Sequence, residues 1–347
     1  GWINGIYTNT SGANTISNNL IGDIATSNVS GRGYTFYGIQ TLGSGANTIT
    51  DNKIGSVSTA NTIAIGGAST GTGVCQFYGI NNSATGLASI SSNIIQNASV
   101  YGTGASKLYG IYNSSTPTGA SISENTLADL STASTGTNGY VIGIENIAAP
   151  ITDISNNTIE SAVINNGYFV GINDNVSSAV SHIISSNTIG NSTLGDISIN
   201  STSTTASIGI NLASTGSYTC SENTIRGIEN TANAAINLYG IQLGSTGSYT
   251  LTENTIEYLS HSSTGSYVSK VNGAYVANSP TSSLINRNKI LYLENLSSSS
   301  TSILSGVYYN SNGTNTLQNN LIKLTNASST DSKKMYGVYI SYGVTTN

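Results

Sequence analysis

The sequence predicts an all-β solenoid in which a coil of about 32 residues repeats along the whole chain. Three observations lead to this prediction. The stretch STGSYTCSENTI at 214–225 returns at 245–256 as STGSYTLTENTI. Gly followed by Ile, Ala or Val recurs at similar intervals from Gly5 to Gly337. Only 7% of the residues are charged, whereas an average soluble domain carries roughly 25%.

Each repeat has a constant part built from three landmarks. The first is the glycine just described. Seven residues later comes a corner of Gly, Pro or Ser, and all three prolines (Pro117, Pro150 and Pro280) fall in this column. The third landmark is a box, apolar-x-x-Asn-x-apolar. The flanking segments are short and rich in Ile, Val, Thr and Tyr, which predicts strands of three to six residues. No segment shows a helical period.

Three strands per coil and parallel stacking at about 4.8 Å predict a rod of ten to eleven coils, about 50 Å long. Identical positions then form columns along the rod. We expect the box asparagines to hydrogen-bond in a structural ladder and to adopt the left-handed conformation of a bend. These are Asn19, Asn52, Asn93, Asn125, Asn157, Asn187, Asn223, Asn254, Asn288 and Asn320. A buried column is expected at Ile16, Ile49, Ile90, Ile122, Ile154, Ile184, Cys220, Leu251, Ile285 and Leu317.

Segments between the box and the next glycine vary in length. The longest lie between Ile54 and Gly79 and between Ile189 and Gly209. Because insertions in solenoids gather on one side, we expect both to leave the same face of the coil.

Boxes such as ISNNTI (154–159) and ISENTL (122–127) resemble right-handed parallel β-helix repeats of the pectate-lyase-like class. The fuller pattern YGIYNSS…SISENTL is similar to repeat regions of large bacterial surface proteins exported by type IX secretion. The resemblance covers essentially all of residues 1–347, which we interpret as one domain. It implies an extracellular or cell-surface location. Members of this fold class include both glycan-active enzymes and stalks, fibres or adhesins, so the fold alone does not choose an activity.

One cluster of charge is dense enough to be considered as a catalytic candidate. Glu222 and Glu253 should stack in adjacent coils with Arg287 next, while Arg226 and Glu257 form a second adjacent pair. Stacked carboxylates are compatible with glycoside hydrolysis or a weak calcium site. Alternating charges on stacked strands are more simply explained as cross-strand pairs, and we favour that interpretation.

A row of tyrosines is the other candidate surface. Tyr275, Tyr308 and Tyr339 occupy the same position in three consecutive coils. An exposed row of rings would form a carbohydrate-binding platform. The alternative is a packing ladder that stiffens the sheet, and this is the interpretation we prefer.

The remaining features give weaker indications of a catalytic or binding site. A column of five threonines (Thr126, Thr158, Thr188, Thr224 and Thr255) suggests an ice-binding array, but a single column beside a bend is not a flat face. His182 and His261 lie in no recognisable catalytic or zinc-ligand pattern, and Cys75 and Cys220 read as unpaired small hydrophobic residues. We expect no metal and no cofactor. Scattered basic residues argue against nucleic acid, and no apolar run is long enough for a membrane helix.

The sequence therefore predicts a non-enzymatic, extracellular structural or adhesive module: a filament subunit or the stalk of a bacterial surface protein. The alternative is a protein that binds or cleaves polysaccharide, as a lyase or hydrolase. Neither end of the sequence reads as a capping element, so we expect partners at the ends. These would be copies of the chain or flanking repeats, stacked end to end.

Overall fold

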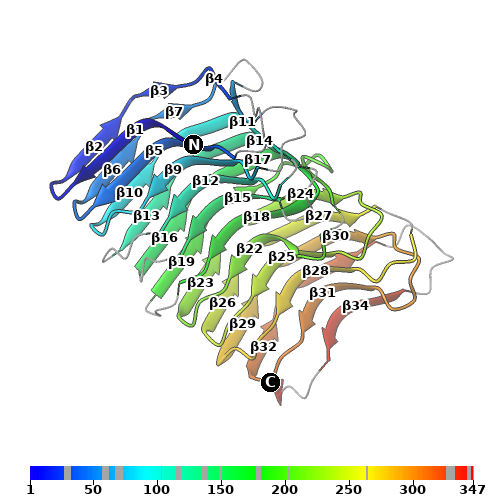
Figure 1. The fold of residues 1–347 in the computed structure, drawn as a ribbon. Coiled ribbons are helices and arrows are strands. Elements are labelled where there is room, and N and C mark those ends of the chain that lie inside the picture. Colours follow the sequence, from blue (N-terminus) through cyan, green and yellow to red (C-terminus); the bar gives the residue numbers. More distant parts are fainter. Residues whose placement is uncertain are drawn as a thin grey trace.

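The computed structural model describes residues 1–26, 33–56, 62–66, 73–102, 104–114, 119–134, 139–147, 151–176, 181–201, 203–262, 265–325, 333–341 and 345–346. Within these ranges every regular element is a β-strand, and the strands build three parallel sheets, here named A, B and C. Figure 1 shows the coils stacked in sequence order from the blue N-terminal coil to the red C-terminal one. The predicted all-β parallel solenoid with about 32 residues per turn is confirmed.

The chain passes through sheets A, B and C in that order and then returns to A. Sheet A consists of β1 (Trp2–Thr10), β5 (Thr35–Gly43), β9 (Gln76–Asn82), β12 (Lys107–Asn113), β15 (Gly139–Asn146), β18 (Gly167–Asp174), β22 (Ser207–Leu212), β25 (Asn237–Leu243), β28 (Lys270–Val276), β31 (Ile303–Tyr309) and β34 (Lys334–Ile340). Sheet B consists of β2 (Asn14–Ser17), β6 (Asn47–Thr50), β10 (Ala88–Ser91), β13 (Ala120–Ser123), β16 (Ile151–Ser155), β19 (Ser181–Ser185), β23 (Ser217–Ser221), β26 (Ser248–Thr252), β29 (Ser282–Asn286), β32 (Thr314–Gln318) and β35 (Thr345–Thr346).

Sheet C is the least regular of the three. It consists of β3 (Leu20–Ile21), β7 (Lys53–Ile54), β11 (Ile94–Gly102), β14 (Thr126–Ser134), β17 (Thr158–Asn165), β20 (Thr188–Ile189), β24 (Thr224–Asn230), β27 (Thr255–His261), β30 (Lys289–Asn295) and β33 (Leu321–Leu324), with β4 (Ile24–Ala25), β8 (Ile63–Ile65) and β21 (Ile197–Asn200) beside this path. The strands span two to nine residues, a wider range than the expected three to six, and the longest, β1, β5, β11 and β14, belong to sheets A and C.

The predicted core column is confirmed. Ile154 pairs with Ile122 in the coil before it and with Ile184 in the coil after it, and all three are fully buried. The same register extends through every predicted member of the column, of which Leu317 alone is only partly buried. Cys75 and Cys220 are free and buried, as expected.

The landmark glycines mark a close approach between sheets A and C. A Cβ atom on Gly38 would lie 2.5 Å from the carbonyl oxygen of Gly79 and 2.9 Å from Cδ1 of Ile54 in sheet C. The other internal landmark glycines meet the corresponding atoms of their own neighbours at similar distances. Steric exclusion of a side chain, rather than a left-handed backbone, therefore explains the recurrence of glycine.

The asparagine ladder is confirmed and has a direction. Asn157 Nδ2 donates to Oδ1 of Asn187 (2.9 Å) and to the carbonyl of Ile122 (2.8 Å), while its own Oδ1 accepts from Asn125 Nδ2 (2.9 Å). The amide-to-amide bonds continue in the same direction from Asn19 to Asn320. Each amide therefore joins its coil to the following one.

The expected left-handed conformation of the ladder asparagines is wrong. The residue with positive φ is the one before each of them, for example Glu222 (58°) and Arg287 (54°). This column comprises Asn18, Asp51, Ser92, Glu124, Asn156, Ser186, Glu222, Glu253, Arg287 and Asn319. The outward residue makes the bend, which leaves the asparagine free to turn its amide inward.

The Gly and Pro column forms the corner between sheets A and B, as predicted. Gly12 lies between β1 and β2, and Pro280 lies between β28 and β29. Pro117, Pro150 and Ser178 lie outside the described residues.

Sheet C contains a further bend, which was not predicted from the sequence. Residues four positions after the ladder asparagine again have positive φ, including Asp129 (52°), Tyr258 (55°) and Tyr292 (54°). Both long connectors branch off one position earlier, at Gly55 and Gly190, and return as β8 and β21, which occupy equivalent positions in sheet C. The expectation that they leave one side of the coil therefore agrees with the described residues.

Candidate functional site

Four of the five charged residues considered as catalytic candidates form two ion pairs. Arg287 Nη1 lies 2.9 Å from Glu253 Oε1, with side chains 64% and 48% exposed. Arg226 Nη1 lies 3.8 Å from Glu257 Oε1. Glu222 accepts a hydrogen bond from Ser186 Oγ (3.3 Å). An exposed pair such as Arg287–Glu253 contributes little to stability, and the arrangement of both pairs is that of cross-strand ion pairs.

The tyrosine row predicted on sheet A is in register but differs from a flat platform. Tyr275, Tyr308 and Tyr339 follow one another on β28, β31 and β34. Their ring planes are tilted by 58° and 51° at centroid distances of 5.3 and 4.8 Å, and Tyr308 is only 5% exposed. This geometry favours packing, while carbohydrate binding by the row stays a prediction.

A second group of tyrosines fills the outer face of sheet A nearer the N-terminus, and we name it the tyrosine cluster. It comprises Tyr78, Tyr109, Tyr112, Tyr140 and Tyr168, on strands β9, β12, β15 and β18. Tyr78 stacks on Tyr109 at 4.8 Å, and the Tyr112 ring meets the Tyr109 ring edge-on at 4.9 Å. The Tyr109 and Tyr140 hydroxyls are hydrogen-bonded to each other. Burial raises the pKa of Tyr168 to about 12, so its hydroxyl stays protonated at neutral pH.

Glu145 lies within the tyrosine cluster. It is 7% exposed and follows Tyr112 in the column, in register with Asn173 of the next coil. Asn173 Nδ2 donates to both carboxylate oxygens, at 2.9 and 3.0 Å. Burial is the largest cause that raises the pKa of Glu145, to about 7, and the hydrogen bond from Asn173 opposes it.

A second amide ladder lies inside the corner between sheets A and B. Thr41 Oγ1 donates to Oδ1 of Asn82 (2.6 Å), and Asn82 Nδ2 donates to Oδ1 of Asn113 (2.7 Å). The series continues from Asn113 to Asn146 (2.8 Å) and from Asn146 to Asp174 Oδ1 (2.7 Å). All five side chains are fully buried. We name this series the corner ladder.

The corner ladder ends at an aspartate paired with a histidine. Asp174 Oδ2 lies 2.7 Å from His182 Nδ1, both side chains are fully buried, and the His182 ring stacks on Tyr218 at 4.7 Å. A carboxylate only accepts hydrogen bonds, so it can end a series in which each amide donates forward. No role was predicted for His182 from the sequence. The corner ladder that leads to this pair is visible in the sequence as the column three residues after each landmark glycine. This column consists of Thr41, Asn82, Asn113, Asn146 and Asp174.

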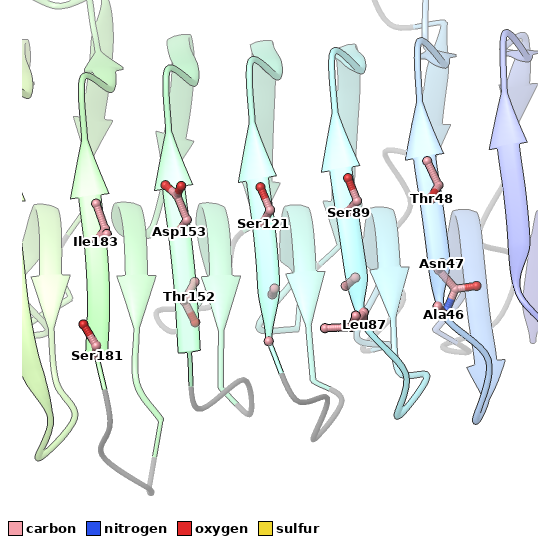
Figure 2. A pocket seen from close by; sticks show the side chains of 13 residues that line it. Ala46, Asn47, Thr48, Leu87, Ser89, Ser121, Thr152, Asp153, Ser181 and Ile183 are labelled. Carbon is pink, nitrogen blue, oxygen red and sulfur yellow. The ribbon is translucent and has the colours of Figure 1, made fainter.

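A shallow groove of about 520 Å³ crosses the outer face of sheet B over β6, β10, β13, β16 and β19. Figure 2 shows Thr48, Ser89, Ser121 and Asp153 side by side along it. Asp153 is the one charged residue among those that line the groove. Leu87 and Ile183, which also line it, are 57% and 44% exposed. The groove runs along the axis of the coil stack and offers an apolar floor with hydroxyl groups.

The predicted threonine column is in register on sheet C, from Thr126 to Thr255. It is bordered two positions later along the strands by Glu160, Arg226 and Glu257 and then by the bend, so it remains a single column. Among the described residues, no group of three or more His, Cys, Asp or Glu is arranged to hold a metal ion. The same residues contain no helix long and apolar enough to cross a membrane.

Comparisons of the chain with protein-family models, with curated proteins and with solved structures found no match. The structure confirms the parallel β-helix part of the resemblance noted in the sequence. The closer likeness to the pectate-lyase-like class and to surface proteins of type IX secretion stays a prediction.

Proposed function

We propose that the protein is a non-enzymatic structural and adhesive module, a rod that serves as a stalk or filament segment of a bacterial surface protein. The observation that supports this most strongly is the unbroken ladder from Asn19 to Asn320. Every coil in this span is bonded to the next through buried amides and through three sheets in register. A stack built this way resists separation of its coils along the axis.

The first and last coils carry apolar side chains that neighbouring coils would bury. Met335 in the last coil is 48% exposed, whereas its register partner Leu304 in the coil before is fully buried. Ile6 in the first coil is only partly buried, whereas its register partner Ile39 is fully buried. Unpaired strand edges favour pairing with another strand. We propose that further coils, from flanking sequence or from another copy of the chain, cover these faces.

The extracellular location belongs to the same proposal. It is supported by the resemblance to exported repeat proteins and by a surface poor in charge, since only 7% of the residues are charged. Surface labelling of intact cells tests the location directly.

Removal of single coils distinguishes a rod from an enzyme or a single-site binder. Deletion of residues 209–239 or of 240–272 joins positions that are equivalent in the register of sheet A, so the remaining coils restack. A rod shortened by about 4.8 Å should keep its assembly and surface attachment, whichever coil is removed. Loss of assembly or of surface attachment with one deletion and not with the other would contradict the proposal. A deletion of half a coil, residues 209–223, serves as the unfolding control.

A second candidate function, polysaccharide binding, is favoured by the groove on sheet B. It spans five coils, about 19 Å, and presents hydroxyls and an apolar floor, as sugar chains require. Glycan-array binding with Ser121→Tyr, which would fill the groove, is the test. Thr158→Tyr on sheet C is the matched control. Equal glycan binding by both variants would exclude the groove as the polysaccharide-binding site.

A further inference from the structure

The most unusual ionisable group on the outer face of the rod is Glu145. Its side chain belongs to a column that faces away from the core, yet it is 7% exposed. The tyrosine cluster and the apolar residues Ile142 and Val170 surround it on β9, β12, β15 and β18. A carboxylate in such surroundings loses most of its hydration.

The groups that face Glu145 compensate its charge poorly. None of the ion pairs among the described residues involves it. From β12, Lys107 Nζ lies 5.6 Å from the centre of the Tyr140 ring rather than on the carboxylate. From β18, Asp174 adds a like charge and is itself paired with His182 on β19.

The remaining neighbours are neutral at physiological pH. The hydroxyls of Tyr78 on β9, Tyr109 and Tyr112 on β12, Tyr140 on β15 and Tyr168 on β18 have pKa values raised by burial. Asn173 is the donor that contacts the carboxylate. Asn173 is held in turn by Asn211, whose Nδ2 donates to the Asn173 Oδ1 at 2.7 Å. One neutral amide therefore carries the whole electrostatic compensation.

We propose that Glu145 is a pH-sensitive latch of sheet A: the protonated carboxyl holds the tyrosine cluster closed, and the ionised carboxylate loosens it. Ionisation places a charge among rings that stabilise it weakly, so the carboxylate gains hydration when the cluster opens. Opening exposes aromatic surface on the side of the rod. The latch is independent of the proposed stalk function, because it concerns one face of coils three to six.

The direction of the pH effect follows from linkage. The folded protein holds the proton more tightly than an open cluster does, since the pKa is raised from 4.5 to about 7. The stabilising effect is therefore fully present below pH 4.5, declines as the pH rises and is lost above about pH 7. The equilibrium constant for opening of the tyrosine cluster should increase about tenfold between pH 6 and pH 8 and then level off.

Hydrogen exchange tests the latch on the intact chain. After correction for intrinsic rates, amides of residues 109–112, 142–145 and 170–173 should exchange about tenfold faster at pH 8 than at pH 6. In Glu145→Gln, which stays neutral, this difference should vanish. Asp153→Asn on sheet B is the matched control and should keep the wild-type behaviour. Equal pH dependence in wild type and Glu145→Gln would overturn the proposal.

A second measurement uses the wild-type protein, so it does not depend on whether a variant folds. In wild-type protein labelled with ¹³C-glutamate, one carboxyl signal should titrate near pH 7. If every glutamate titrated near pH 4.5, the latch would be excluded, whatever the exchange data showed.

Discussion

Asp174 and His182 lie 2.7 Å apart in the fully buried corner between sheets A and B, where the corner ladder ends. Beyond this pair the corner is filled by Leu212, Tyr218, Leu243 and Tyr249. The pair thus separates an amide-filled half of the corner from an aromatic and aliphatic half. The first prediction concerns the cost of breaking it.

His182→Phe keeps a ring against Tyr218 but leaves the buried Asp174 carboxylate with the neutral Asn146 amide in place of an ion-pair partner. Because an unpaired buried charge is costly, we expect a loss of about 3–5 kcal/mol in urea unfolding. The double variant with Asp174→Asn should recover a large part of this loss, since the charge is gone. Additive effects in this double-mutant cycle would mean that the two side chains are not coupled.

The buried column gives the second prediction. Ile154→Asp places a charge between Ile122 and Ile184 and should destabilise the protein by several kcal/mol. The control Ile154→Val removes one methyl group and should cost about 0.5–1.5 kcal/mol. A thermal melt of Ile154→Asp that coincides with the wild type would show that this column faces solvent.

The third prediction separates the ladder from the bend beside it. Asn157→Leu removes the acceptor of the Asn125 backbone N–H and the donor to the Ile122 carbonyl, at about 1–3 kcal/mol for each unsatisfied group. The Asn125 side-chain amide keeps its bonds to two backbone carbonyls. Asn156→Gly at the neighbouring left-handed position (φ 57°) should be nearly neutral, because glycine adopts this conformation freely. Similar losses in both variants, measured by urea unfolding, would contradict the different roles assigned to the two columns.

The fourth prediction concerns the charged residues. Arg287→Ala removes the pair with Glu253, and both side chains are largely solvated. We expect a change below about 1 kcal/mol in urea unfolding, and a smaller one in high salt. A loss of more than 2 kcal/mol would show that the pair does more than neutralise neighbouring strands.

The sequence predicts best those columns in which one residue type has to recur. The buried amides from Asn19 to Asn320 each bond to the next, and the landmark glycines leave no room for Cβ, so both columns can be read directly. The corner ladder was missed because its column changes from Asn146 and Asp174 to Leu212 halfway along the rod. A mixed column shows no repeat, although its contacts are as regular.

The left-handed positions could not be assigned from residue type. Tyr258 and Tyr292 occupy a position that Asp129 fills in an earlier coil, although a bulky side chain disfavours positive φ. Stacking of the two rings at 5.1 Å and 9° accompanies this conformation. Burial of Glu145 was equally invisible, since it depends on the rings of coils three to six rather than on its own column.

The central claim is that the molecule is a stack of coils that bears load along its axis, and single-molecule stretching between its ends tests this most directly. We predict a stiff rod that yields in steps. Each step should release one coil of about 32 residues, or about 110 Å of extended chain. Smooth extension at low force, without steps of this size, would contradict the account.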